Sequence, residues 1–456
     1  MLFLGENMKK NNKFFVVTYG CQMNKHDSEK IIGLLLSQGY KRAETMEGAD
    51  IIIFNTCCVR GSAEDRLFGN INSLKLIKDK RQDLIIAVGG CVAQKEGSKL
   101  QRKMSHVDVV FGTHNIASLP TLIKEAQKGK IACEVLKSPR DEIKALPVER
   151  DNSVRAWVNI STGCNNFCSY CIVPYVRGRE TSRSFEDIVA EVKMLASEGF
   201  LEVTLLGQNV NSYGRDLYGE IRFAELLRQL NEIDGIERIR FTSSHPRDFN
   251  GDIVLALAEC EKVCEHVHLP LQAGSDNVLK TMRRGYTKEG YLDLVKKIYE
   301  AVPNCSITTD IIVGFPGETE EDFLDTLDVV KQARFDNAFT FAYSPREGTR
   351  AFEMENQISK KVKMDNFKRL LEVQNKNSLK NNLVLMEKEL EVLVESPSKK
   401  KADVLTGRTR TNKVVNFPGP HSLINRLARV KIKEVRSWSL NGELKEVCER
   451  ESICRL

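Results

Sequence analysis

The chain has 456 residues, 41% of them hydrophobic and 29% charged, with 68 Lys and Arg against 62 Asp and Glu. At about 150 residues per domain, this length predicts two to four domains that each bury a core, which excludes a disordered or fibrous chain. No apolar run approaches the roughly 18 residues of a membrane helix. Glu6, Lys9 and Lys10 interrupt the N-terminus before any signal-like stretch develops. We therefore expect a cytoplasmic protein with no membrane partner.

The cysteine content indicates metal chemistry. Thirteen cysteines, an odd number in a long chain without a secretion signal, favour reduced thiols over a disulfide framework. Some of these thiols are expected to hold metal.

The first 130 residues alternate short β-rich runs with segments of helical periodicity, such as residues 27–38. This alternation predicts an α/β domain over residues 13–135, a doubly wound parallel sheet with helices on both faces. Residues 137–152 lack a period and are expected to be a linker. The expected strands are 14–19, 50–54, 84–88 and 107–111.

The alternation resumes on a larger scale after the linker. The first helix is well marked, because Ser184 can cap its start and Gly199 can end it. Six βα units of this size predict a (β/α) barrel or part-barrel over residues 150–385. The expected strands are 156–160, 202–206, 238–242, 266–269, 307–313 and 337–341.

The C-terminal part is basic. After a helical stretch at 358–389, residues 396–436 carry eleven Lys and Arg against two acidic residues, a local charge of +9. Short β-like runs at 391–394, 413–417 and 428–435 are separated by Gly and Pro and predict a small antiparallel β-barrel. We place this domain at residues 388–440.

Cys164, Cys168 and Cys171 form a C-x3-C-x2-C cluster directly after the first strand of the central domain. Three thiolates this close in sequence indicate a loop wrapped around a metal or cluster. A zinc knuckle is disfavoured because no fourth ligand lies nearby. Three thiolates on a cubane iron-sulfur cluster leave one iron open for a substrate or cofactor, which is a catalytic feature.

A second, dispersed set follows three strands of the N-terminal domain. Cys21, Cys57 and Cys91 each come directly after an expected strand. Because the carboxyl ends of parallel strands share one edge, these thiolates are expected to meet and to hold a second cluster. The alternative is that Cys serves only as a small apolar residue at strand ends. Cys58 is expected to point away from Cys57 in an extended chain.

At these residues the sequence resembles the radical S-adenosylmethionine (SAM) enzymes, through C-N-N-F-C-S-Y-C from Cys164 to Cys171. It is more narrowly similar to the MiaB-type tRNA methylthiotransferases, whose second-cluster cysteines match Cys21, Cys57 and Cys91. The resemblance runs from about Lys13 to Ser439. It rests on T-Y-G-C-Q-M-N, A-W-V-N-I-S-T-G-C, I-V-P-Y-V-R-G-R-E-T-S-R, L-L-G-Q-N-V-N-S-Y-G and F-A-Y-S-P-R-E-G-T.

The resemblance implies a transferase with two 4Fe-4S clusters and SAM as cofactors. The three domains would be a methylthiotransferase domain with an auxiliary cluster, a radical SAM domain and a TRAM domain. Such enzymes insert a methylthio group at carbon 2 of N(6)-isopentenyladenosine at position 37 of tRNA, next to the anticodon. Expected partners are tRNA, a reducing electron donor such as flavodoxin or ferredoxin, and a sulfur carrier; DNA is not expected.

The loops after the barrel strands are expected to face SAM, since active sites of such folds lie at that end. Side-chain amides and hydroxyls there can bond ribose or carboxylate oxygens, and glycine lets the backbone approach the adenine. His245 and His268 are more simply explained as core-lining residues than as proton donors. The expected cofactor-binding residues are Tyr170, Arg183, Gln208, Asn209, Ser243, Ser244, Gly314, Phe315 and Pro316.

The basic C-terminal segment resembles a TRAM domain, a small RNA-binding barrel. Its positive charge suits phosphate neutralisation, although a charge run can also be only a solvated face. The expected RNA-binding residues are Arg408, Arg410, Lys413, Arg429 and Lys431.

Two alternatives stay open at this point. The same chemistry could act on a threonylcarbamoyl-adenosine tRNA or on a ribosomal protein. The chain could also be a non-catalytic iron-sulfur RNA-binding sensor, which would not cleave SAM.

Overall fold

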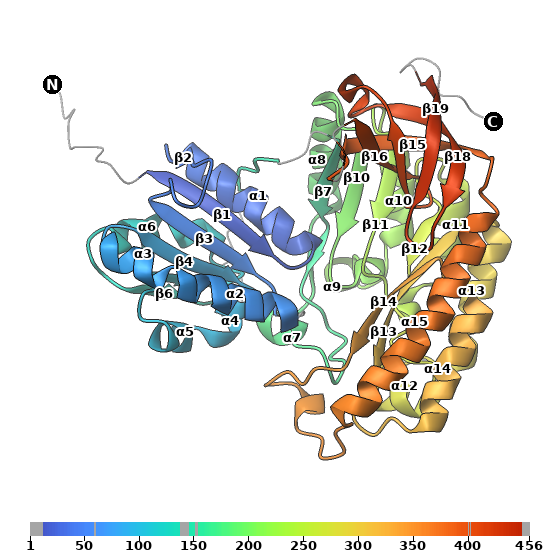
Figure 1. Cartoon of the computed structure of the whole chain (residues 1–456), viewed down its shortest axis with the longest axis horizontal. Coiled ribbons are helices and arrows are strands. Elements are labelled where there is room, and N and C mark those ends of the chain that lie inside the picture. The colour runs from blue at the N-terminus through green and yellow to red at the C-terminus, as the bar shows by residue number, and fades with distance from the viewer. Residues whose placement is uncertain are drawn as a thin grey trace. The chain divides into compact units, whose positions relative to one another are not determined.

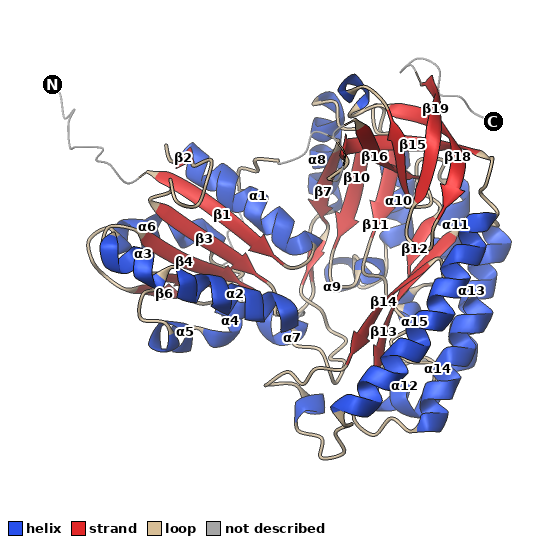
Figure 2. Cartoon of the chain, in the orientation of Figure 1, coloured by secondary structure: helices blue, strands red, loops and turns tan. Residues whose placement is uncertain are grey.

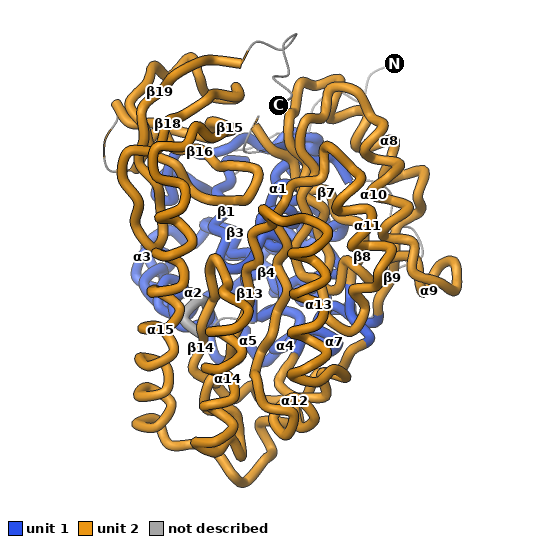
Figure 3. Tube along the Cα trace, turned by 90° about the vertical axis from the view of Figure 1, so that its right-hand side faces the viewer, with its two compact units in different colours: residues 1–151, 163–165, 172–179 blue, residues 152–162, 166–171, 180–456 orange. Residues whose placement is uncertain are grey.

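The computed structural model describes residues 12–58, 61–136, 146–150, 154–399, 401 and 403–448. It divides into two compact units (Figure 3). The first unit comprises residues 1–151, 163–165 and 172–179, and the second comprises 152–162, 166–171 and 180–456. In the described part of the chain, no helix is long and apolar enough to cross a membrane.

The first unit is built on a six-stranded, wholly parallel sheet with the order β2-β1-β3-β4-β5-β6 (Figure 1). Every residue of β3 and β4 is buried, as expected for parallel strands covered on both faces. The strands are β1 (Lys13–Tyr19), β2 (Lys41–Arg42), β3 (Ile51–Thr56), β4 (Ile85–Gly90), β5 (Val109–Phe111) and β6 (Ala132–Glu134).

Helices cover both faces of this sheet. Alternate strand residues belong to two cores: Ile51, Ile53 and Ile85 pack with α1 (Gln22–Ser37) and α6 (Leu119–Ala126). The intervening residues pack with the helices of the other face, namely α2 (Gly61–Ser73), α4 (Cys91–Glu96) and α5 (Ser98–Lys103). The doubly wound prediction is thus confirmed.

The strand order reverses between β1 and β3, because the chain leaves β1 for β2 on one side and then crosses to β3 on the other. In open α/β sheets, ligands bind at such a switch point, outside the carboxyl ends of the strands. Cys21 follows β1 and Cys57 follows β3, so both lie at this position.

The second unit contains a part-barrel of two three-stranded parallel sheets, β11-β10-β7 and β12-β13-β14. An isolated bridge between Ile239 and Val263 is the link between the sheets. Among the described strands, β7 and β14 do not pair, so the barrel is open. The strands are β7 (Arg155–Asn159), β10 (Glu202–Leu206), β11 (Arg238–Phe241), β12 (His266–His268), β13 (Ser306–Val313) and β14 (Asn337–Ala342).

Helices pack on the outside of the part-barrel (Figure 2). The helix after β7 begins as predicted, because the Ser184 hydroxyl accepts a hydrogen bond from the Asp187 amide at 3.2 Å. The principal helices are α8 (Phe185–Ser197), α10 (Phe223–Asn231), α11 (Gly251–Glu259), α13 (Lys288–Ala301), α14 (Glu320–Ala333) and α15 (Lys360–Leu383).

A closed barrel with the order β15-β16-β17-β19-β18 ends the second unit. Four of its strand pairs are antiparallel, but β17 and β19 pair in parallel. An odd number of strands cannot close with every neighbour antiparallel, so five strands force one parallel pair. The strands are β15 (Glu389–Pro397), β16 (Val404–Thr409), β17 (Val414–Pro418), β18 (Leu427–Val435) and β19 (Leu440–Val447).

This small barrel caps the amino-terminal ends of the part-barrel strands. Arg238, the first residue of β11, donates to the Arg408 carbonyl at 2.8 Å and to Glu391 at 2.7 Å. Arg155, the first residue of β7, pairs with Glu395 at 3.0 Å. The carboxyl ends of the same strands, where active-site loops are expected, therefore lie at the opposite end.

Several elements differ from the sequence expectation. The short strands β2 and β6 and the barrel strands β16 and β19 were not predicted. β19 also continues past residue 440, the expected end of the domain. Most of the predicted linker, residues 137–145 and 151–152, lies outside the described residues.

Candidate active site

The first cysteine set lies at the carboxyl edge of the parallel sheet. Cys21 is the N-cap of α1, Cys57 follows β3, and Cys91 is the first residue of α4, directly after β4. Gly20, at φ +136°, allows this close approach, because a Cβ there would collide with the Cβ of Cys57. The structure therefore places all three cysteines at the same edge of the sheet.

Local interactions favour thiolates at two of these cysteines. A hydrogen bond with the Cys57 side chain, together with the charge of Arg177, lowers the pKa of the Cys21 thiol to about 6 despite its burial. A hydrogen bond with Cys58 and the same guanidinium lower the pKa of Cys91 to about 7. Thiolates are the form that binds iron.

Arg177 is a functional residue that the spacing argument did not identify. Its guanidinium is buried and donates to the Asp27 carboxylate at 2.7 Å, and its charge acts on both Cys21 and Cys91. The residue lies in the segment I-V-P-Y-V-R-G-R-E-T-S-R, only six positions after Cys171. A buried charge at this position requires anionic partners, and the cysteine set supplies them in addition to Asp27.

Cys58 does not point away from the set, contrary to the sequence expectation. Its side chain bonds that of Cys91, and this contact and burial raise the pKa of Cys58 well above its usual value. The chain leaves the extended conformation at the end of β3, so the alternation rule no longer applies. Four thiols thus form two neighbouring pairs, Cys21 with Cys57 and Cys58 with Cys91.

The donor set suits an iron-sulfur cluster. In the described part of the chain, no three His, Cys, Asp or Glu side chains converge on a point that could hold a metal ion. A cubane cluster binds each cysteine to a different iron, so its ligands need not converge on one atom. Thiolates with a buried cation beside them match the negative charge of such a cluster.

The second cysteine set has a buried guanidinium of its own. Arg284 is 4% exposed and donates to the Cys168 sulfur at 3.3 Å and to the Pro270 carbonyl at 3.2 Å. Its guanidinium also lies over the ring of Tyr286, 5.3 Å from the ring centroid, which is within the roughly 6 Å of a cation–π contact. Among the described residues, no carboxylate pairs with Arg284. The Cys168 sulfur is therefore the cluster-assigned group that this buried cation contacts.

The other two members of this set lie close along the chain. Cys164 belongs to the first unit and donates its amide to the Gly178 carbonyl at 3.2 Å. Cys168 and Cys171 belong to the second unit, and the Cys171 amide closes a turn on the Cys168 carbonyl at 2.9 Å. Their grouping around a cluster rests on the C-x3-C-x2-C spacing.

Unpaired polar atoms mark the loops at the carboxyl ends of the strands. The Asn209 Oδ1, Ser244 Oγ and His245 Nε2 atoms are buried, and among the described residues none has a hydrogen-bond partner. Buried polar atoms are nearly always paired in folded proteins, so these three fit a polar ligand in these loops. Asn209 and Ser244 are among the residues predicted to bind SAM.

Other predicted cofactor residues are placed differently. Arg183 donates to Glu191 at 2.6 Å and to the Asn159 carbonyl at 2.8 Å, so its guanidinium already has structural partners. Phe315 is fully buried and its ring packs against Tyr343, which leaves only its backbone for a ligand. Half-buried Tyr170 packs on the same apolar cluster as Phe315.

The glycine loop after β13 is held in shape by a carboxyl group. Gly314, at φ +70°, donates its amide to Glu318 at 2.5 Å, and burial raises the pKa of Glu318 to about 7. Pro316 is buried in the same loop, whereas Gln208 and Ser243 are half-buried in the loops after β10 and β11. Sequence reasoning named the glycine and missed Glu318.

The two histidines have structural partners. The His245 Nδ1 atom accepts from the Arg247 amide at 3.2 Å, and burial lowers the pKa of His245 to about 2. His268 lies 3.0 Å from the Thr308 hydroxyl and 3.4 Å from Asp310. Neither placement requires proton transfer.

Two of the five predicted RNA-binding residues, Arg410 and Lys413, hold the small barrel to the part-barrel through their side chains. Arg410 binds Glu265 through both carboxylate oxygens at 2.7–3.0 Å, and Lys413 pairs with Asp336. Arg408 pairs with Glu395 in the barrel itself. The remaining two, Arg429 and Lys431, pair with partly exposed carboxylates, those of Glu446 and Glu387.

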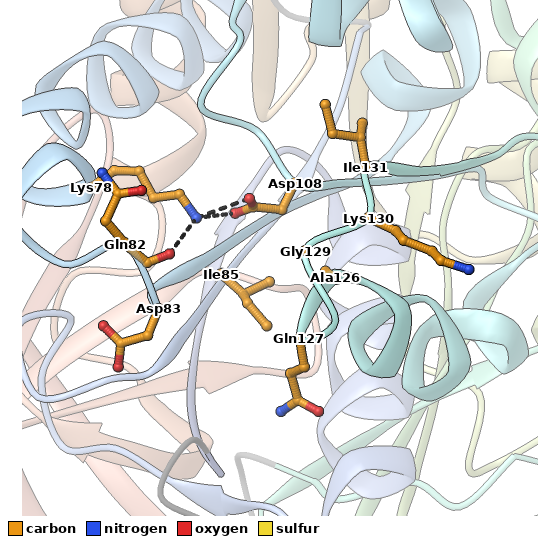
Figure 4. Close-up of a pocket in the computed structure, with 10 residues that line it drawn as sticks. All are labelled: Lys78, Gln82, Asp83, Ile85, Asp108, Ala126, Gln127, Gly129, Lys130 and Ile131. Carbon is orange, nitrogen blue, oxygen red and sulfur yellow. Dashed lines mark hydrogen bonds and ion pairs between the residues drawn. The ribbon is translucent and has the colours of Figure 1, made fainter.

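A pocket of about 490 Å³ lies elsewhere in the first unit (Figure 4). It is formed at the amino ends of β4, β5 and β6, the edge opposite to the cysteines. Lys78 donates to both carboxylate oxygens of Asp108 at 2.9 Å within it. It contains no cysteine and is lined by Lys78, Gln82, Asp83, Ile85, Asp108, Ala126, Gln127, Gly129, Lys130 and Ile131.

Comparison with known proteins matches this architecture domain by domain. Family models match residues 158–330 (Radical SAM superfamily), 13–112 (Uncharacterized protein family UPF0004) and 387–445 (TRAM domain). The radical SAM methyltransferase TsrM from Kitasatospora setae shares the fold, with a TM-score of 0.54 at 15% identity over 75% of each chain.

Curated relatives are similar over nearly the full length. A protein of Thermoanaerobacter sp. (strain X514) is 53% identical over 97% of this chain and 94% of its own, and one of Alkaliphilus oremlandii is 54% identical over 96% and 94%. Both are named tRNA-2-methylthio-N(6)-dimethylallyladenosine synthase. The chain belongs to this family. As a radical SAM methylthiotransferase it uses SAM and 4Fe-4S clusters.

Proposed function

We propose that this methylthiotransferase inserts a methylthio group at carbon 2 of N(6)-isopentenyladenosine at position 37 of tRNA. The observation that carries the proposal is the presence of two separate thiol sets in one chain, each with a buried guanidinium, Arg177 or Arg284. When bound, the clusters and SAM supply the adenosyl radical at one set and the sulfur atom at the other.

The chain's own residues provide the surroundings for this chemistry. Cys164, Cys168 and Cys171 are assigned to the SAM-binding cluster, and Cys21, Cys57 and Cys91 to the auxiliary cluster. The unpaired atoms of Asn209, Ser244 and His245 are assigned to SAM. These residues would hold and orient the cofactors, which perform the difficult chemical steps.

The domain and partner assignments follow from the same proposal. Residues 13–135 would form the methylthiotransferase domain, 150–385 the radical SAM domain and 388–440 the TRAM domain. tRNA is the substrate, a flavodoxin or ferredoxin supplies electrons, a sulfur carrier is a further partner, and the protein works in the cytoplasm.

The test compares three reconstituted proteins under anaerobic conditions. They are the wild type, a Cys164→Ala/Cys168→Ala/Cys171→Ala variant and a Cys21→Ala/Cys57→Ala/Cys91→Ala variant. About eight irons are expected in the wild type and about four in each triple variant. Only the wild type should form methylthio product from isopentenyladenosine tRNA with SAM and dithionite.

The outcomes separate the alternatives. Cys133→Ala, which changes an exposed cysteine, should match the wild type in iron and product. If 5′-deoxyadenosine forms but the tRNA stays unmodified, the acceptor would instead be a threonylcarbamoyl-adenosine tRNA or a ribosomal protein. Eight irons without SAM cleavage would instead identify a sensor.

A further inference from the structure

An unusual face lies inside the open part-barrel. Phe339 and Phe341 of β14 are 47% and 38% exposed, although large aromatic side chains of a strand normally form the core. β14 is an edge strand, paired only with β13 among the described strands, so the interior of the barrel opens beside it.

Register places both rings on the interior face. Ala338 packs with Ile307, Ile311 and the outer helices, so the alternate residues of β13 and β14 face the opposite way, into the barrel. Asp310 is the β13 partner of Phe339, and Ile312 is that of Phe341. The interior face therefore presents His268, Thr308, Asp310, Ile312, Phe339 and Phe341.

A carboxylate is fixed between the aromatic rings and an imidazole. The His268 ring lies 3.4 Å from Asp310 through Nε2 and 3.0 Å from the Thr308 hydroxyl through Nδ1. It also meets the Phe339 ring edge to face at 5.9 Å. The Asp310 side chain is 30% exposed, so it can still accept a hydrogen bond from a ligand.

We propose that Phe339, Phe341 and Asp310 form the subsite that selects a neutral, alkyl-substituted adenine. Aromatic rings stack on a nucleobase and bury a branched alkyl group. The carboxylate can accept from the one hydrogen that remains on N6 of such a base. This inference rests on the proposed function and names the residues that choose its acceptor.

The same carboxylate would reject the rival acceptor. Threonylcarbamoyl-adenosine carries a carboxylate on the N6 substituent, and like charges placed together oppose binding. Selectivity often uses such a repulsive element along with attractive contacts. Asp310 would therefore discriminate between the two modified adenosines, while the phenylalanines would separate isopentenyladenosine from plain adenosine.

The test measures binding by the reconstituted enzyme with SAM under anaerobic conditions. Fluorescence anisotropy would compare three RNA stem-loops that differ only in carrying adenosine, N(6)-isopentenyladenosine or N(6)-threonylcarbamoyladenosine. The variants are Phe339→Ala, Phe341→Ala and Asp310→Asn. Leu324→Ala is the matched control, because Leu324 on α14 is also 47% exposed but lies on an outer helix.

Each variant has its own signature. Phe339→Ala and Phe341→Ala should weaken binding of isopentenyladenosine RNA by roughly 5- to 150-fold. Asp310→Asn should reduce the discrimination against threonylcarbamoyl RNA by about tenfold or more. Leu324→Ala should change neither, and all four proteins should retain wild-type melting temperatures and cluster spectra.

Failure of this inference differs from failure of the proposed function. The subsite alone would be overturned if the wild type modifies isopentenyladenosine RNA and the phenylalanine variants bind all three RNAs as tightly as the wild type does. Lower melting temperatures with unchanged RNA selectivity would show that the rings only pack, which also overturns it. A wild type that neither binds nor modifies isopentenyladenosine RNA would overturn both.

Discussion

Two arginines are the residues whose charges bear most directly on the chemistry. Arg177 and Arg284 are buried, and each lies beside thiols assigned to a cluster. Burying a guanidinium costs several kcal/mol unless an anion balances it. Arg177 pairs with the Asp27 carboxylate, whereas Arg284 donates to the Cys168 sulfur and pairs with no carboxylate among the described residues. The two arginines should therefore respond differently to substitution.

Replacing Arg284 by Gln should lower the midpoint potential of the SAM-binding cluster. A nearby positive charge stabilises the reduced, more negative cluster, so its removal favours oxidation by roughly 50–100 mV. Redox titration followed by electron paramagnetic resonance would measure this in the Cys21→Ala/Cys57→Ala/Cys91→Ala background. Arg284→Lys keeps the charge and should shift the potential less; equal shifts for both variants would contradict an electrostatic role.

Removing either partner of the Arg177–Asp27 pair should destabilise the first unit. Arg177→Gln leaves the Asp27 carboxylate without its cation, and Asp27→Asn leaves Arg177 without its carboxylate, each at a cost of about 3–5 kcal/mol. The double variant should lose clearly less than the sum of the two. Hydrogen exchange of the β1, β3 and β4 amides would report the opening free energy. Additive effects would mean that the 2.7 Å contact contributes nothing beyond packing.

At the residue scale, sequence reasoning identified groups whose chemistry is visible in their spacing. Cys21, Cys57 and Cys91 were found because each follows a strand of a parallel sheet. Arg284 was missed because nothing in its neighbourhood shows that it reaches Cys168, 116 positions away. Cys58 was misplaced because its direction depends on how the chain turns after β3.

At the element scale, the loop between β13 and α14 shows how a helix start shapes a ligand loop. Thr319 and Asp322 form a capping box that begins α14, and Glu318 just before it accepts from the Gly314 amide. Lys363 of α15 fills the space where a Cβ of Gly314 would lie. The loop is thus fixed by elements on both sides.

Glu318 should make the stability of this loop depend on pH. Its folded pKa of about 7 exceeds its ordinary value of 4.5, so the folded state binds more protons between these values and loses stability as the pH rises. The loss reaches about 3 kcal/mol above pH 7. Glu318→Gln should therefore be more stable relative to wild type at pH 8 than at pH 5.

Hydrogen exchange in β13 and α14 at the two pH values would measure this difference. Glu321→Gln, which changes an exposed carboxyl in the first turn of the same helix, is the control and should show no such difference. An identical pH dependence of stability in wild type and Glu318→Gln would contradict the raised pKa of Glu318.

Elements with a strong hydrophobic period were the ones that sequence predicted well. The strand at 202–206 agrees with β10, and the Ser184 cap lies where expected. β2 has only two residues, and β16 contains Gly and Arg with few apolar residues, so neither has a readable pattern. β14 was predicted as a strand, but its sequence pattern does not reveal that its two phenylalanines face an open interior.

At the scale of the whole molecule, the TRAM barrel and the proposed SAM loops lie at opposite ends of the same strands. β13 has eight residues and spans roughly 26 Å at about 3.3 Å per residue. An RNA that reaches both ends must therefore be longer than the modified nucleotide and its neighbours. Arg238, Arg240 and Arg410 fix this separation through hydrogen bonds between the two barrels.

This arrangement predicts that the TRAM barrel contributes to the salt dependence of binding for a long RNA but not for a short one. Arg429 and Lys431 are predicted RNA contacts that pair only with exposed carboxylates of the small barrel or its approach and do not join the two barrels. If each neutralises one phosphate, Arg429→Gln/Lys431→Gln should reduce the slope of log affinity against log salt by about 1.4–1.8 for intact tRNA. A trinucleotide centred on the modified adenosine should show no change, because it cannot reach the TRAM barrel from the far end of the strands. Arg410→Gln should act differently: it breaks the bidentate pair with Glu265 and should expose the segment between α15 and β15 to limited proteolysis. An unchanged tRNA slope in the double variant, with intact docking, would assign phosphate binding to another surface and leave these two cations as solvated residues.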